Sequence, residues 1–280
     1  VENIKVFLAK DISKPFICCE YTNAMGNAGG AMHKYSDLTD TEPLDQGGFI
    51  WEYIDQTIYK KDRYGNEFQA YGGDFNERPT DYNFSANGIV YGGDREPSPK
   101  MQEVKFNYQN ITAEVTKDQV KVINKNLFLN TGVYECVVTA ARNGKTVREL
   151  VMATDVEPLS EKVYDLPLPK ETIPGEYTIT VSFRLKENTI WAKAGHEVAF
   201  GQYVYAIREE KKACRRPVKV IRSKHNIGVR GESFEAIFSG PEGGLVSYRY
   251  AGKEMIKEIP KPNYWRAPVA NDQGNQMQKR

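Results

Sequence analysis

Two runs of apolar residues near the N-terminus predict buried strands. PFICC (15–19) is continuously apolar and is followed by the carboxylate of Glu20, and GGFIWEYI (47–54) has the same character. Continuous apolar runs of this length are typical of strands in a parallel sheet that is covered on both faces. We therefore expect two parallel strands, the first of which ends on a negative charge.

Helical periodicity appears after each of these runs. We expect a helix over 27–38 with Asn27 as its N-cap, because apolar residues recur there at three-residue spacing. These residues are Met32, Tyr35 and Leu38. A second helix is expected over 98–111, where Ser98 is a suitable cap and Pro99 falls in the first turn. Strand, helix and strand in this order form one unit of a parallel α/β architecture.

The segment 55–93 shows neither the periodicity of a helix nor that of a strand, and we expect a long loop there. It carries glycine pairs at 72–73 and 92–93, and the neighbouring Asp74 and Asp94 are interpreted as structural turn residues. Loops of this length inside a compact domain usually have a function.

From about residue 111 to residue 207 the pattern changes to alternation with a period of two. The alternating runs predict five to seven strands, and Asn143-Gly144 is a typical two-residue hairpin turn. Strands at this density predict an immunoglobulin-like β-sandwich.

A basic stretch, KKACRRP (211–217), reads as a linker to a third β-rich segment that begins at Val218. We therefore expect three domains, over 1–110, 111–210 and 211–280. The pattern predicts no closing element at the C-terminus and no complete domain at the N-terminus, so we expect the sequence to be cut at both ends.

Composition narrows the classes of function. Of 280 residues, 40% are hydrophobic and 27% are charged, as in ordinary globular proteins. Lys and Arg number 38 against 37 Asp and Glu, so no basic excess indicates nucleic acid or an anionic membrane as a partner. We recognise no signal peptide and no run of the roughly 18 apolar residues that span a bilayer. A cytoplasmic or a periplasmic location is compatible with these features.

The cysteines predict reduced, buried thiols. They are Cys18, Cys19, Cys136 and Cys214. Neighbours in a strand point to opposite faces, which disfavours a bridge between the first two. No Cys or His spacing suited to zinc is present.

Two parallel strands with their helices do not close a sheet, whereas a complete (β/α)₈ barrel takes roughly 200 residues or more. We interpret 1–110 as the last part of such a barrel. Active sites of these barrels lie at the C-terminal ends of the strands, which is where Glu20 falls. The competing interpretation is a carboxylate that caps the next helix or pairs with an arginine.

Several motifs, in order along the whole chain, resemble glycoside hydrolase family 2 and in particular its large bacterial β-galactosidases. They are CEYTNAMGN (19–27), QGGFIWEYIDQ (46–56), AYGGDF (70–75), FSANG (84–88), WAKAGHEVAFGQY (191–203) and NYWRAP (263–268). The resemblance implies a multidomain α/β plus all-β fold: a partial TIM barrel, an immunoglobulin-like sandwich and the first piece of a larger β-sandwich. It also implies hydrolysis of terminal β-D-galactosides with retention at the anomeric carbon.

The resemblance assigns roles to individual residues. Glu20 matches the nucleophile of the CEY motif, and Trp51 matches a tryptophan that packs against the sugar. The carbonyl of Phe84 and the side-chain oxygen of Asn87 match sodium ligands, with Asn87 close to the substrate. Asn23 stands where the best-known members have a histidine that contacts the substrate, so the sugar specificity is open.

Some family parts have no counterpart in this sequence. The acid/base glutamate of the catalytic pair, a third sodium ligand and the magnesium ligands lie on earlier segments of the family. We therefore expect this chain to be inactive alone, although the full-length protein would use sodium and magnesium, act on a small-molecule β-galactoside and form a homo-oligomer.

Two alternatives remain at this point. A non-catalytic module that binds carbohydrate or links domains would account for 111–207 but not for CEYTNAMGN. A related enzyme with β-glucuronidase or β-mannosidase specificity would account for both.

Overall fold

The computed structural model describes residues 1–10, 13–82, 84–209 and 216–279. The chain divides into two compact units, one formed by Val1–Arg208 with Pro268–Arg280 and the other by Glu209–Ala267. The predicted linker 211–217 and Cys214 fall almost entirely outside the described residues.

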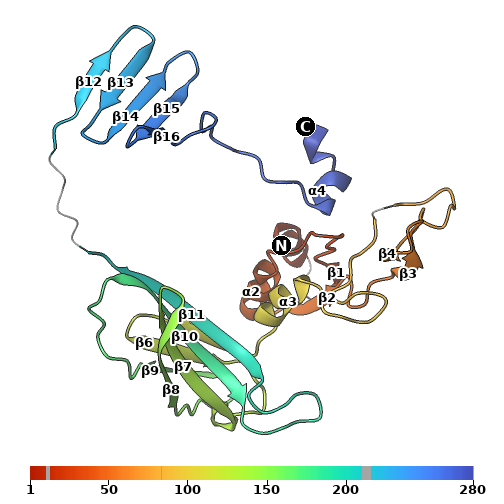
Figure 1. The fold of residues 1–280 in the computed structure, drawn as a ribbon. Helices are drawn as coiled ribbons and strands as arrows, with labels where there is room; N and C mark the ends of the chain where they lie inside the picture. The colour runs from red at the N-terminus through yellow and green to blue at the C-terminus, as the bar shows by residue number, and fades with distance from the viewer. Residues whose placement is uncertain (11–12, 83, 210–215, 280) are drawn as a thin grey trace. The chain divides into compact units, whose positions relative to one another are not determined.

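The N-terminal part of the first unit is a strand–helix–strand unit, as predicted. Its elements are α1 (Glu2–Leu8), β1 (Phe16–Tyr21), α2 (His33–Thr41) and β2 (Asp45–Ile50). Strands β1 and β2 pair in parallel, with Phe16 opposite Asp45 and Tyr21 opposite Ile50. Figure 1 shows α2 in the connection between the two strands, so their carboxyl ends lie at the same edge of the sheet.

Helix α2 begins later than the sequence predicts. The expected start at Asn27 is wrong, because Met32 occupies the N-cap position. Gly29 and Gly30 have φ of 130° and 122°, a conformation that a right-handed helix excludes. The helix therefore forms only after this glycine pair.

The predicted burial of β1 is also wrong. Ile17 in β1 and Phe49 in β2 are mostly exposed, and only Tyr21 of β1 is buried. The local core is small and consists of Ile4, Leu8 and Leu38. A sheet of two strands cannot cover both of its own faces, so an apolar run that suits a barrel interior remains open here.

The segment expected to be a loop contains a hairpin. Strands β3 (Ile58–Lys61) and β4 (Glu67–Ala70) pair antiparallel across a turn in which the Asp62 carboxylate accepts backbone N–H bonds from Tyr64 and Asn66. Two flanking aspartates have the turn roles that were predicted. Asp74 accepts the backbone N–H of Tyr71, and Asp94 accepts that of Glu96.

The second predicted helix is shorter than expected. Helix α3 spans Lys100–Asn107, and no side chain caps its start. The hydroxyl of Ser98 instead faces the carbonyl of Gly88 at 3.5 Å, so its predicted capping role is wrong.

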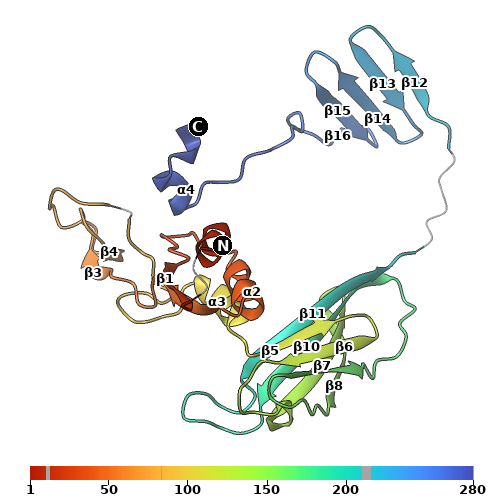
Figure 2. The same ribbon diagram turned by 180° about the vertical axis from the view of Figure 1, so that it is seen from behind.

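Residues 111–207 form two antiparallel sheets. Strands β11 (Glu197–Ile207), β10 (Gly175–Leu185), β7 (Tyr134–Arg142) and β8 (Lys145–Met152) form one sheet in that order. Strands β5 (Ile111–Val115), β6 (Gln119–Asn124) and β9 (Ser160–Asp165) form the other. A short 3₁₀ helix, η1 (Thr131–Val133), precedes β7. Figure 2 shows the two sheets facing each other, and their core draws on strands of both.

The interior of this sandwich is closely packed. Its most deeply buried side chains include Val120 and Val122 from one sheet and Val138, Val181 and Phe183 from the other. The predicted hairpin turn joins β7 to β8, where Asn143 and Gly144 have φ of 49° and 77°, as a type I′ turn requires.

The sandwich and the N-terminal part of the first unit are tied by polar contacts. The side-chain amide of Gln109 exchanges two hydrogen bonds with the backbone of Phe200, at 3.0 and 3.2 Å. Asp40 of α2 forms an ion pair with Lys125, at 2.8 Å.

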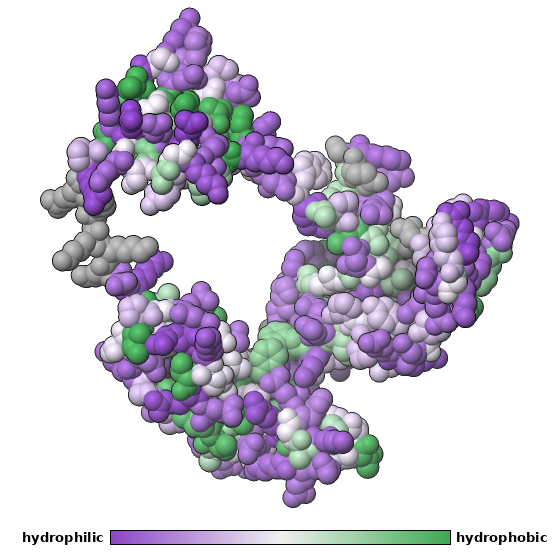
Figure 3. Space-filling view, viewed as in Figure 1, coloured by the Kyte–Doolittle hydropathy of each residue, from purple (hydrophilic) through white to green (hydrophobic). Residues whose placement is uncertain are grey.

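The second unit is an antiparallel sheet in chain order. Its strands are β12 (Lys219–Arg222), β13 (Asn226–Arg230), β14 (Phe234–Ser239), β15 (Gly244–Tyr250) and β16 (Lys253–Glu254). Figure 3 shows apolar residues on its surface. Ile221 and Phe238 of this sheet are exposed.

The last residues pack with the first unit. Helix α4 (Ala270–Gly274) and the 3₁₀ helix η2 (Met277–Lys279) belong to it by contacts. The three predicted domains, 1–110, 111–210 and 211–280, remain a proposal. None of the helices in the described part of the chain combines the length and hydropathy needed to cross a membrane.

Candidate active site

Glu20 lies near the end of β1, beside the end of β2. The backbone N–H of Trp51 donates to the carbonyl of Tyr21 at 3.1 Å, which joins the two strand ends directly. Glu20 is exposed, and Trp51 is 40% exposed. The predicted nucleophile and the predicted sugar platform therefore lie at the same edge of the sheet and are open to solvent.

The pairing of β1 is irregular at Glu20. From Cys18 to Tyr21 strand β1 advances three residues, whereas β2 advances two between their partners Gly48 and Ile50. An extra residue in one strand locally redirects side chains, and such bulges are common beside active sites. The irregularity spans Cys19 and Glu20.

Asn23 is the hydrogen-bond partner of the Glu20 carboxylate. Its Nδ2 donates to Glu20 Oε1 at 3.1 Å. Its Oδ1 is buried and has no partner. Asn23 therefore holds the carboxylate with one end of its amide, while the acceptor end is buried without a partner.

Thr22 connects these two residues in a costly conformation. Its φ is 52°, which is unusual for a β-branched residue and costs about 1–3 kcal/mol. Its hydroxyl oxygen is also buried without a partner. Strain and an unpaired polar atom at one residue indicate that the backbone here is shaped for a purpose other than stability.

A third chain segment lies against the first two. Ile54 and Val90 form a parallel bridge, and the N–H of Ile89 donates to the carbonyl of Glu52 at 2.9 Å. The peptide bond between Trp51 and Glu52 is cis. This pairing brings Asn87 beside the residues that follow β2.

Asn87 has the features expected of a cation ligand. Its side chain is buried, and its Oδ1 has no hydrogen-bond partner. Hard oxygen atoms are the ligands that alkali and alkaline-earth ions prefer, so this atom fits the predicted sodium site. Phe84, the other predicted ligand, lies in the same segment with its ring exposed. The described residues contain no group of three or more His, Cys, Asp or Glu side chains that is suited to a metal.

Lys100 fixes the backbone on both sides of Asn87. Its Nζ donates to the carbonyls of Ala86 and Gly88, at 2.7 and 3.2 Å. Burial lowers the pKa of this ammonium, although the charge of Asp55 acts in the opposite direction. The ammonium group of Lys100 thus holds the loop that carries Asn87.

A cavity of about 560 Å³ lies next to these residues. Its lining includes Thr22, Asp55, Asn87, Lys100 and Glu103. It combines the unpaired oxygens of Thr22 and Asn87 with the buried carboxylate of Asp55 and the half-buried ammonium of Lys100, and this combination suits a polar ligand.

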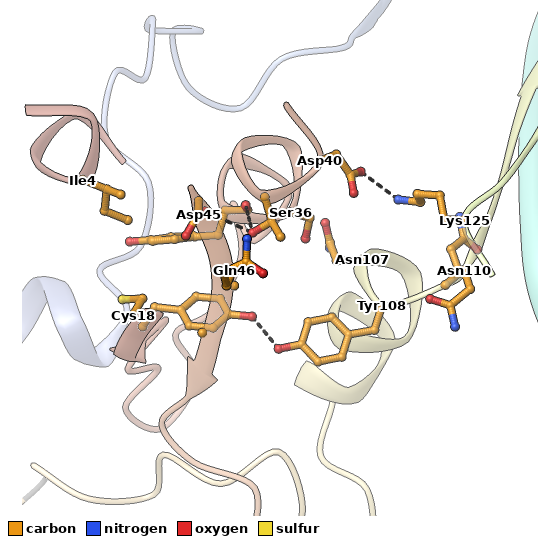
Figure 4. A pocket seen from close by; sticks show the side chains of 16 residues that line it. Ile4, Cys18, Ser36, Asp40, Asp45, Gln46, Asn107, Tyr108, Asn110 and Lys125 are labelled. Carbon is orange, nitrogen blue, oxygen red and sulfur yellow. Dashed lines mark hydrogen bonds and ion pairs between the residues drawn. The ribbon is translucent and has the colours of Figure 1, made fainter. Parts of the chain in front are cut away.

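A second cavity of about 470 Å³ lies elsewhere and is less suited to the predicted chemistry. Figure 4 shows its lining, in which Tyr108 meets the hydroxyl of Tyr21, and Asp40 meets Lys125. Burial, together with the bond to Tyr108, raises the pKa of Tyr21. These polar groups already satisfy one another. Glu20 lines neither this cavity nor the first one.

Sequence reasoning missed three residues of this region. Glu52 directly follows Trp51, and burial raises the pKa of its carboxyl. Its position after a strand end was a usable signal. Lys100 and Asn271 gave no such signal, because both act through backbone groups that are distant along the chain.

Comparisons with known families match three successive regions. Residues 2–113 match "Glycosyl hydrolases family 2, TIM barrel domain". Residues 120–206 match "Beta-galactosidase, domain 4", and residues 230–280 match "Beta galactosidase small chain". All three descriptions point to one family.

Curated relatives agree over nearly the whole chain. It is 49% identical to a β-galactosidase of Halalkalibacterium halodurans over 98% of its length, and 45% identical to one of Clostridium acetobutylicum over 99%. The chain spans 27% and 31% of the lengths of these two relatives. The chain belongs to glycosyl hydrolase family 2 and resembles the β-galactosidases within it.

Proposed function

We propose that this chain carries the nucleophile of a retaining glycoside hydrolase that releases terminal β-D-galactose. One observation carries the proposal: the exposed carboxylate of Glu20 lies at a strand end, held by Asn23 and beside Trp51. The β-galactosidase relatives support galactose as the sugar and a small carbohydrate as the substrate.

The chemistry requires two carboxyl groups about 5–5.5 Å apart. A Glu20 oxygen attacks C1 of the galactose, and the bond from C1 to the leaving oxygen breaks as a second carboxylic acid protonates that oxygen. Water then attacks C1 of the resulting ester while the second carboxylate takes its proton. Galactose is released and both carboxyl groups return to their initial states.

The neighbours of Glu20 fit supporting roles. Asn23 donates to the carboxylate and orients it. The partly exposed ring of Trp51 offers a flat apolar surface to the C–H face of galactose. Asn23 is shorter than a histidine and does not titrate near neutral pH, so the hydrogen bond that it donates does not depend on its own protonation.

Asn87 Oδ1 and the carbonyl of Phe84 would hold an alkali cation next to the substrate. Such an ion would supply a fixed positive charge and an additional ligand position for a sugar hydroxyl. Lys100 holds the backbone on either side of Asn87 and so fixes the position of the Asn87 side chain as a ligand. Magnesium, which the family resemblance implies, is assigned no ligands among these residues.

The architecture that goes with this function has three parts. We assign 1–110 to the C-terminal portion of a TIM barrel, 111–210 to an immunoglobulin-like sandwich and 211–280 to the start of a larger β-sandwich domain. The two-sheet arrangement of β5 to β11 supports the second assignment. The acid/base residue is assigned to another barrel strand, and the full-length protein is proposed to be a homo-oligomer.

The test uses the full-length gene product and chromogenic aryl glycosides. We expect Glu20→Gln to abolish hydrolysis of the β-galactoside, with a loss of at least about 10³-fold, because the ester cannot form. Glu67→Gln, at an exposed glutamate in β4, is the matched control and should retain activity. Undiminished activity of the Glu20 variant would rule out the nucleophile role.

The sugar specificity is tested with the same assay. We expect β-galactosides to be cleaved faster than β-glucuronides and β-mannosides. A preference for either of the latter would replace the galactose assignment but leave the role of Glu20 intact. Because general acid catalysis contributes about 10²–10⁴-fold, the chain alone should show no measurable turnover.

A further inference from the structure

Helix α4, near the C-terminus, meets the segment that directly follows Glu20. The side chain of Asn271 forms two hydrogen bonds there: its Nδ2 donates to the carbonyl of Asn23 at 2.8 Å, and its Oδ1 accepts the N–H of Met25 at 2.9 Å. Asn23 and Met25 lie 248 and 246 positions before Asn271 in the sequence. One amide side chain therefore satisfies both a donor and an acceptor of the same short stretch of backbone.

Further contacts fix the position of Asn271. The N–H of Ala270 donates to the side chain of Asn27 at 2.9 Å. On the helix side, the Asp272 carboxylate accepts the N–H of Val269 at 2.9 Å. The segment and the helix approach closely at Gly26, where a Cβ atom would lie 3.3 Å from that of Ala270. The amide of Asn271 is thus held against the segment from both sides.

The bonded stretch controls the direction of the Asn23 side chain. Its Nδ2 holds Glu20 Oε1, and its backbone follows the strained Thr22, whose φ is 52°. A residue after such a conformation relies on its surroundings to keep one orientation. Asn271 holds the backbone carbonyl of Asn23, and the side chain of the same Asn23 holds Glu20. Restraint of this backbone therefore also restrains the bond to Glu20.

We propose that Asn271 is a positioning residue for the glycosyl-ester reaction, because it fixes the segment from which Asn23 orients the Glu20 carboxylate. The inference rests on the proposed function for its catalytic consequence, whereas the contact itself is independent of that function. It also assigns a role in the active site to the C-terminal segment, which lies far from the other site residues in the sequence.

Hydrogen exchange tests the contact without any assay of activity. In the full-length gene product, Asn271→Ala removes the acceptor of the Met25 N–H. We expect exchange of the Met25 amide to become at least about tenfold faster, as measured by mass spectrometry on peptides that cover the segment. Gln273→Ala, on the same short helix, is the matched control and should leave this exchange unchanged. Unchanged exchange in Asn271→Ala would overturn the proposal.

Kinetics test the consequence. A displaced carboxylate lowers the rate of attack, so we expect kcat/KM of Asn271→Ala to fall about 10- to 100-fold. The loss should be equal for aryl galactosides with good and with poor leaving groups, because proton donation to the leaving group is untouched. Faster exchange with unchanged kcat/KM would leave only a structural contact and overturn the positioning role.

A second variant separates the two hydrogen bonds. Asn271→Asp keeps an acceptor for Met25 but loses the donor to the carbonyl of Asn23. We expect slow exchange at Met25 to persist while kcat/KM still falls, and full activity would contradict the proposal. Retained activity in Glu20→Gln would instead refute the proposed function, and the exchange results would then stand by themselves.

Discussion

The sandwich at 111–207 and the α/β part before it differ in how far they bury their apolar side chains. The two sheets of the sandwich bury a shared core, in which Val138 and Phe183 are fully enclosed. In the α/β part, Ile17 and Phe49 lie on a two-stranded sheet with open faces. The proposed nucleophile lies in the part with the smaller core. The sandwich therefore supplies most of the buried core, whereas the α/β part carries the proposed nucleophile.

The largest effect expected from this difference is on stability. Phe183→Ala in β10 should lower the free energy of unfolding by about 3–5 kcal/mol, because it leaves a cavity in a close-packed core. Phe49→Ala in β2 should change it by less than about 0.5 kcal/mol, because this ring is exposed. Denaturant unfolding of the chain measures both. Equal losses would contradict the contrast in packing.

Thiol reactivity offers a second test. Cys19 on β1 is exposed, whereas Cys136 on β7 is buried, and its burial raises the pKa of its thiol to about 12. With Cys214 replaced by serine, we expect a thiol reagent to modify Cys19 at once and Cys136 only after unfolding, since the thiolate is the reactive form. Rapid labelling of Cys136 would show that the sandwich core is open. The prediction that all the thiols are buried is already wrong for Cys19.

A smaller effect is expected at the strained residue next to the nucleophile. Thr22→Gly should raise the free energy of unfolding by about 1 kcal/mol, because glycine adopts the positive φ and removes the buried unpaired hydroxyl. The same change should lower activity, since the segment loses its fixed shape. Thr22→Ala, which removes the hydroxyl but keeps the strain, is the control. Lower stability of the glycine variant would mean that Thr22 is not strained.

The smallest effect concerns pH. Burial, with a smaller contribution from Asp55, raises the pKa of Glu52 in the folded state above its ordinary value of 4.5. The folded state then binds this proton more tightly than the unfolded state does. The contribution of Glu52 to the free energy of unfolding is therefore fully present below pH 4.5 and is lost as the pH rises through the folded pKa. Glu52→Gln should flatten this decline in urea titrations at several pH values, and an unchanged slope would contradict the assignment.

Features set by local sequence were predictable. The Asn143-Gly144 turn needs positive φ at two successive residues, and those residue types announce it. The shared edge of Glu20 and Trp51 also followed from the sequence, because the carboxyl ends of parallel strands coincide. The apolar runs indicated correctly where the strands lie.

Features set by tertiary contacts were not predictable. Asn27 resembles a helix cap, but its side chain accepts a hydrogen bond from Ala270 of a distant helix. The burial of β1 was overestimated because an apolar run reports what a strand can bury, not what covers it. Asn271 carries no local signal, since its partners are backbone groups more than 240 positions away.

If Glu20 forms the covalent bond to the sugar, the glycosyl ester on its carboxylate can be trapped. The full-length gene product is incubated with a 2-deoxy-2-fluoro-β-galactosyl fluoride, which forms the ester rapidly and releases it slowly, and is then digested for peptide mass spectrometry. We expect a fluorogalactosyl adduct on Glu20 that is absent from Glu20→Gln. An adduct on another carboxylate, with Glu20 unmodified, would contradict it.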